Sequence, residues 1–150
     1  MAEPEYGRLL REARERSGKT IEEMASLLGI SWESYNDLET YDDEIILVIS
    51  LEQLVTLSHA LGIDLIEFFS NGAPKPAESV SLEALAESIN EYLTANKLTV
   101  AEFEDAVGWE VANCLTDPSQ FLNFNLDGLK DVTKPLSVDW RAVLAHLSQE

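Results

Sequence analysis

The residues that could carry out chemistry are few and widely spaced in this sequence. Its 150 residues include two histidines, His59 and His146, and one cysteine, Cys114. Metal sites and histidine-activated nucleophiles need such side chains grouped, and the sequence has no Cys/His cluster, glycine-rich phosphate loop or G-x-S-x-G elbow. Cys114 has no partner for an internal disulfide, so we expect it to be buried and reduced. We therefore expect no enzyme activity, no metal and no cofactor.

Carboxylates dominate the charge of the chain. It has 28 Asp and Glu residues against 10 Lys and Arg residues, which gives a formal net charge of -18. Half of the basic residues lie within the first 19 positions, and none lies between residues 20 and 74. Affinity for DNA comes largely from Lys and Arg at phosphates, so the chain lacks the usual basic footprint of a nucleic-acid-binding domain.

Nothing in the sequence indicates a membrane protein or a secreted one. No apolar run approaches the roughly 18 residues that cross a bilayer. The N-terminal segment also lacks the apolar core of a signal peptide. We expect a cytoplasmic protein with no membrane partner.

The segment from Thr20 to Glu39 predicts two short helices joined by a tight turn, because apolar residues recur at helical spacing on both sides of Gly29. Thr20 and Glu23 fit a capping box, which would start a helix. Gly29 can end that helix in a left-handed conformation, and Ser31 can cap the next one. Two short helices around a glycine turn form a helix-turn-helix.

This pattern resembles the lambda-repressor-like (Cro-type, XRE) family over residues 6 to 69. The resemblance implies a bundle of about five helices and a role as a DNA-binding transcriptional regulator. The residues that carry it are the run Arg14 to Ala25, then Leu28-Gly29-Ile30-Ser31, Leu38-Glu39, and the later apolar positions Leu51, Leu54, Leu57, Leu61 to Asp64 and Phe68.

The resemblance also implies roles for single residues. Arg14 and Glu39 would form a structural ion pair that ties the first helix to the end of the third. If the domain binds DNA, the base-facing residues would be Ser31, Ser34, Tyr35 and Asn36, and the phosphate contacts would be Arg8 and Lys19. The chain departs from the family at Ile21, where DNA-binding members usually carry a glutamine.

The helix that would read DNA is acidic. It offers no Lys or Arg for guanine, and Asn36 supplies its one amide for adenine. Two charges 4 Å apart interact by roughly 1 kcal/mol in water and by more at an interface, so several carboxylates facing phosphates would remove ordinary affinity. We therefore predict a surface for a basic protein partner, formed by Trp32, Glu33, Tyr35, Asn36, Asp37, Tyr41, Asp42, Asp43 and Glu44.

An apolar insert, residues 45–49, follows the acidic helix where the resembled family has a shorter polar segment. Its β-branched residues favour extended structure, so we expect a short strand or loop. The insert either packs on the second half of the chain or offers an edge to a partner or to a second copy, which leaves a homodimer open.

The second half repeats the first half in a degenerate form. Thr20 to Met24 corresponds to Thr99 to Phe103 at an offset of 79, and the helix that starts at Leu51 corresponds to the one at Leu126 at an offset of 75. A fixed offset predicts a duplicated fold. Residues 121–124 lie opposite the apolar insert, and one interpretation is that the two stretches are short strands that pair across a pseudo-twofold joint.

The copy has lost the features that would read DNA. Leu93 stands in place of Arg14, and Asp117-Pro118 stands where Leu38-Glu39 would be, so the expected ion pair is absent. The segment Trp109 to Leu115 is short, mostly apolar and without cations. We expect it to serve packing or protein contact.

We thus predict an all-α fold of two tandem lambda-repressor-like helix-turn-helix bundles of about five helices each, with a short two-stranded pairing of the inserts as an option. The predicted domains are residues 1–70 and 81–150, joined by a Gly- and Pro-rich linker at 71–80. The predicted function is non-enzymatic regulation through a basic protein partner, as in antitoxins, immunity proteins or DNA mimics. The alternative is a sequence-specific DNA-binding regulator.

Overall fold

Every element that the structure describes is a helix, so the predicted all-α class is confirmed. The computed structural model describes residues 5–70, 76 and 78–149, and no strand occurs in these ranges. Most of the predicted linker, namely residues 71–75 and 77, lies outside the described residues.

The first half contains the predicted helix-turn-helix. Its helices are α1 (Tyr6–Arg16), α2 (Ile21–Leu28), α3 (Trp32–Thr40), α4 (Glu44–Leu47), α5 (Leu51–Leu61) and α6 (Leu65–Ser70). Thr20 and Glu23 form a capping box at the start of α2, and Gly29 ends α2 with a left-handed φ of 69°. The Ser31 side chain accepts a hydrogen bond from Ser34 N and so caps α3.

Residues 45–47 of the apolar insert lie in helix α4 and residues 48 and 49 form the turn after it, so the predicted strand is wrong. Ile45 and Ile49, four residues apart, are both 1% exposed, whereas Leu47 and Val48 are 48% and 55% exposed. A strand would place Ile45, Leu47 and Ile49 on one face, while helix α4 and the turn after it let the two isoleucines enter the core without Leu47. Packing therefore overrides the β-propensity of these residues.

The second half repeats the helix order of the first. Its elements are α7 (Leu82–Asn96), α8 (Val100–Val107), α9 (Ala112–Thr116), the 3₁₀ helix η1 (Pro118–Asn123), α10 (Leu126–Thr133), the 3₁₀ helix η2 (Lys134–Leu136) and α11 (Trp140–Ser148). Thr99 and Glu102 form a capping box, and Gly108 is left-handed, as at the equivalent positions of α2. Helix α9 has five residues against nine in α3, and Pro118 follows its extended C-cap, Asp117.

Each of the two stretches that were predicted to pair as strands hydrogen-bonds to the element that follows the other one. Leu51 N donates to Phe124 O at 2.7 Å, and Asn125 Nδ2 donates to Leu47 O at 2.8 Å. The strand pairing itself is wrong, because α4 and η1 are both helical.

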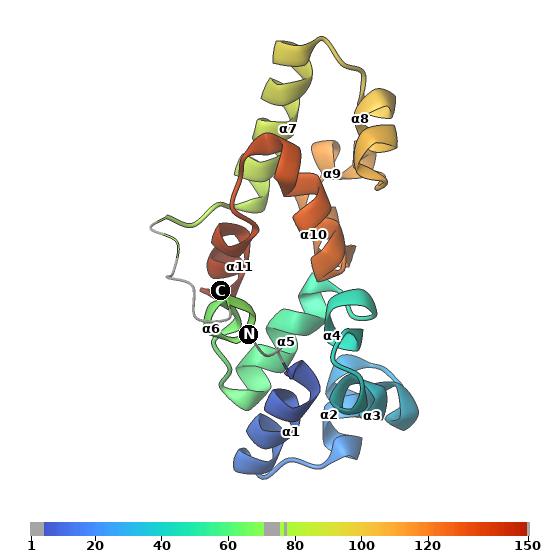
Figure 1. Cartoon of the computed structure of the whole chain (residues 1–150), viewed down its shortest axis with the longest axis vertical. Coiled ribbons are helices and arrows are strands. Elements are labelled where there is room, and N and C mark those ends of the chain that lie inside the picture. Colours follow the sequence, from blue (N-terminus) through green and yellow to red (C-terminus); the bar gives the residue numbers. More distant parts are fainter. Residues whose placement is uncertain (1–4, 71–75, 77, 150) are drawn as a thin grey trace.

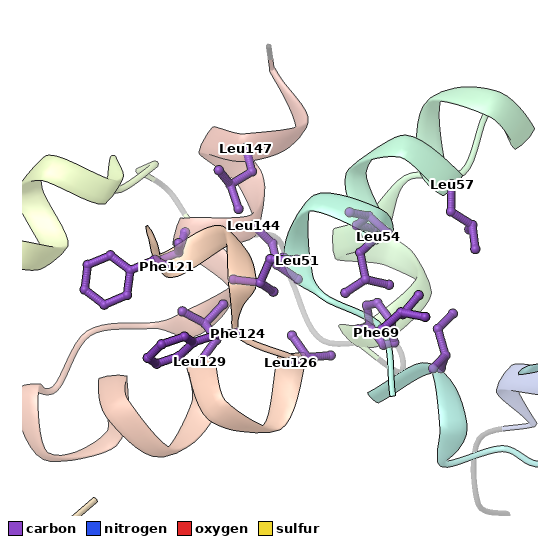
Figure 2. Packing of buried hydrophobic residues seen from close by; sticks show 14 of the residues in the cluster. Leu51, Leu54, Leu57, Phe69, Phe121, Phe124, Leu126, Leu129, Leu144 and Leu147 are labelled. Atoms are coloured by element: carbon purple, nitrogen blue, oxygen red, sulfur yellow. The ribbon is translucent and has the colours of Figure 1, made fainter. Parts of the chain in front are cut away.

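One apolar core runs through both halves. Helix α6 packs on α11, α5 packs on η1 and α11, and α4 packs on α10. Figure 2 shows Leu51 of α5 beside Phe124, Leu129 and Leu144 of the second half, and all four side chains are buried. In Figure 1 this joint lies between two ends, one carrying α2 and α3 and the other carrying α8 and α9. The exact domain boundaries stay a prediction.

Candidate partner-binding surface

A buried ion pair holds the end of α3 against α1. Arg14 donates from Nε to Glu39 Oε2 at 2.6 Å and from Nη2 to Glu39 Oε1 at 3.0 Å. The two side chains are 14% and 3% exposed. Arg14 Nη1 also donates to Lys19 O at 3.0 Å. This two-pronged, charge-assisted geometry is strong and directional, so it fixes where α3 presents its outer face.

Gly7 lets α1 approach the end of α3 closely. A Cβ at this position would lie 2.5 Å from Glu39 O. The backbone N–H of Gly7 donates to Asp42 Oδ1 at 3.0 Å, so Asp42, predicted to contact a partner, also satisfies a donor in the first turn of α1. Gly7 was not among the predicted residues, and its one signal in the sequence is a glycine close to the apolar positions of the first helix.

Tyr35 does not reach the surface, which corrects both predicted sites that included it. Its side chain is 0% exposed and lies on the inner face of α3 with Leu38. Burial, followed by the Glu39 carboxylate, raises the pKa of Tyr35, so the phenol stays neutral. Its hydroxyl has no hydrogen-bond partner among the described residues.

The outer face of α3 combines carboxylates with an aromatic ring. Trp32 is 43% exposed at the start of the helix. Glu33 is exposed and Asp37 is half-buried, and these two residues lie four apart on the same face. Like charges at this spacing cost an isolated helix about 0.2–0.5 kcal/mol. Residues 20–70 contain no Lys or Arg that could relieve this repulsion.

Large hydrophobic side chains are exposed in one part of the described chain. They are Leu27 (51%), Trp32 (43%), Tyr41 (55%), Leu47 (48%) and Val48 (55%), and all belong to α2, α3, α4 or the residues that adjoin them. The exposed Asp43 and the half-buried Glu44 lie between Tyr41 and Leu47. Exposed apolar side chains that gather in this way mark interaction sites. We call the outward residues of α2 to α4 the α3 surface.

Most residues of the predicted DNA-binding alternative are engaged within the chain. Ser31 Oγ donates to Ser34 Oγ at 2.9 Å and also accepts from Ser34 N. Arg8 donates to Glu5 and Glu12 at 2.6 and 2.7 Å, and these ion pairs lie along α1. Lys19 and Asn36 are half-buried, and Asn36 remains on the outer side of α3.

The second half does not present an equivalent of the α3 surface. Glu104 Oε2 accepts from Val111 N at 2.7 Å and from Ala112 N at 3.1 Å, so donors at the start of α9 are satisfied internally. No large hydrophobic side chain is strongly exposed among the described residues of this half.

Beside α9, burial and then Asp117 raise the pKa of Cys114 to about 11, which keeps the thiol protonated and poorly nucleophilic at neutral pH.

The described ranges hold neither a grouped set of metal ligands nor a membrane-spanning helix. No three His, Cys, Asp or Glu side chains there are grouped so that they could hold a metal ion. None of the described helices combines the length and the apolar character that a bilayer crossing requires.

The geometry defines a class: an α-helical bundle in which α2, a left-handed glycine turn and α3 form a helix-turn-helix. Residues 5–66 match the family model described as a helix-turn-helix domain. The N-terminal part of the chain is therefore a helix-turn-helix domain of the lambda-repressor-like (XRE) kind, as the resemblance implied. Domains of this kind are regulatory. Comparison with curated proteins and with solved structures found no match.

Proposed function

We propose that this chain is a non-enzymatic regulatory protein that uses its α3 surface to bind a basic protein, in the manner of an antitoxin, an immunity protein or a DNA mimic. One observation carries the proposal. The outer face of the helix-turn-helix presents carboxylates, among them Glu33 and Asp37, together with exposed apolar side chains such as Trp32.

Charge argues against ordinary DNA binding by this surface. Proteins gain affinity for DNA by placing Lys and Arg at phosphates and releasing counterions. The α3 surface has no cation to offer, and its carboxylates would repel the phosphates. A basic protein would instead neutralise the carboxylates of Glu33 and Asp37 and relieve their mutual repulsion.

The apolar side chains suit a protein partner. Aromatic residues dominate the binding energy of protein interfaces when they are buried by the partner, and surrounding charges mainly set the association rate. Trp32 and Tyr41 lie at the two ends of α3 and would act as anchors. The carboxylates between and beside them would steer a basic partner toward these anchors.

The proposal is tested by affinity capture with the full-length chain as bait, compared with two variants. Asp37→Lys reverses a charge on the α3 surface, and Glu87→Lys makes the same change on an exposed position of α7. The captured protein should be basic, its association rate should fall as salt rises, and Asp37→Lys should lose it while Glu87→Lys keeps it. A captured protein that is neither basic nor sensitive to salt would contradict the proposal.

The second candidate is sequence-specific DNA binding, which the helix-turn-helix family match favours. Duplexes from the protein's own genome would be selected at about 0.15 M salt, where contacts between Lys or Arg and phosphates still contribute. Tight binding that is lost in Asn36→Ala would establish this candidate over the first. We expect no such selection, and we expect the chain to pass through a heparin column unretained.

A further inference from the structure

The joint between the two halves follows the rule of a twofold-symmetric dimer. In such an interface, if element i of one subunit contacts element j of the other, then j of the first also contacts i of the second. By the sequence repeat, α4, α5 and α6 correspond to η1, α10 and α11.

In the described part of the chain, three of the four main contacts across the joint fit this rule, and the fourth, between α5 and α11, has no counterpart of similar extent between α10 and α6. Helix α6 packs on its own equivalent, α11. Helix α4 packs on α10, and the exchanged pair, η1 and α5, is also in contact. Figure 1 shows the consequence, because the two helix-turn-helix units lie at opposite ends of the molecule with these elements between them.

The joint is built like a subunit interface in its chemistry as well. Its centre is apolar, with Leu51 of α5 buried beside Phe124 and Leu144 (Figure 2). Among the described residues three hydrogen bonds cross it, from Leu51 N to Phe124 O at 2.7 Å, from Asn125 Nδ2 to Leu47 O at 2.8 Å and from Arg141 Nη1 to Ser70 Oγ at 3.5 Å.

We infer that the second half is a built-in dimer partner: it covers the face of α4 to α6 on which a second copy of the first half would pack. The chain is therefore a monomer with a single α3 surface, since α9 has five residues and its first N–H groups are capped by Glu104. Each chain therefore has one binding site for the partner of the α3 surface. This inference does not depend on the nature of the partner.

The test begins with the intact chain and then cuts it. Light scattering at high protein concentration should give the monomer mass of 16.7 kDa. A protease site placed within residues 71–75 then allows the chain to be cleaved after it has folded. The two fragments should stay together as one particle of the same mass. An intact chain that dimerises, fragments that separate at once, or N-terminal fragments that pair with each other would overturn the inference.

A matched pair of variants shows whether the joint itself holds the fragments. Asn125→Asp keeps the oxygen that caps α10 through Gly128 N but replaces the donor to Leu47 O by a carboxylate. Asn123→Asp adds the same charge where the side chain bonds only locally, to Gln120. In the cleaved protein, Asn125→Asp should weaken the association of the fragments by about tenfold relative to Asn123→Asp. Equal association of the two variants would count against the joint as the holding contact.

Discussion

Arg14 and Glu39 are the two side chains on which the placement of α3 chiefly depends. Glu39 is 3% exposed, and Arg14 supplies two hydrogen bonds to its carboxylate. Removing Arg14 would leave the buried Glu39 carboxylate with only the exposed Arg11, whose Nε lies 3.8 Å from Glu39 Oε1, and this loss is more costly than the net contribution of the pair itself.

We therefore expect Arg14→Met to lower the free energy of unfolding by about 3 kcal/mol, measured by urea denaturation. The double variant Arg14→Met/Glu39→Met should recover part of that loss, because no charge is then stranded. Arg8→Ala is the control, since its ion pairs are exposed on α1 and its removal should leave stability nearly unchanged. A loss in Arg8→Ala equal to that in Arg14→Met would refute this account.

Gly7 is the second residue that sets the distance between α1 and α3. Alanine favours a helix over glycine by about 1 kcal/mol, so Gly7→Ala would stabilise an isolated α1. In the folded protein the new Cβ would lie 2.5 Å from Glu39 O, and the two helices would have to move apart. We expect Gly7→Ala to destabilise the protein by about 1–3 kcal/mol, visible as a lower melting temperature. Arg16→Ala, exposed on the same helix, should show no such loss.

Helix α4 illustrates how a short element takes its form from packing. Helix α4 and the turn after it bury Ile45 and Ile49 and leave Leu47 exposed, whereas a strand would bury all three or none. We expect Ile49→Ala to cost about 2–4 kcal/mol in urea denaturation, and Leu47→Ala to cost little. Equal losses for the two variants would support an extended segment instead.

Helices α3 and α9 show how one duplicated element can diverge. Both follow a capping box and a left-handed glycine, but α9 is shorter and is followed by Pro118. Both halves thus keep the helix-turn-helix scaffold, but only the first keeps an outward surface of acidic and apolar residues. That division agrees with the proposal that α3 contacts the partner while the second half serves packing.

The molecule as a whole carries a strong excess of negative charge, with a formal net charge of -18. Such an excess destabilises the compact state by self-repulsion, and salt screens it. The Debye length falls from about 30 Å at 0.01 M to about 10 Å at 0.1 M ionic strength. We expect the melting temperature to rise with NaCl over this range. The triple variant Glu22→Gln/Glu87→Gln/Glu91→Gln, changed at exposed positions, should show a weaker rise; an unchanged slope would rule out self-repulsion as the cause.

The sequence by itself determined the helices of the helix-turn-helix and the sign of its surface. Thr20, Gly29 and Ser31, like Thr99 and Gly108 in the second half, act through hydrogen bonds and backbone conformations within a few residues, so local spacing was enough to place them. The burial of Tyr35 could also have been predicted from the sequence, because Tyr35 and Leu38 have the spacing of one helix face.

Only the tertiary structure decided the form of the apolar insert, the contact of Asp42 with Gly7 and the joint between the halves. Each depends on groups that are distant in sequence, such as Asn125 and Leu47, whose hydrogen bond joins residues 78 positions apart. Periodicity describes which residues share a face of one element. Periodicity does not say which other element of the protein will pack over that face, because that depends on the burial gained across the whole core.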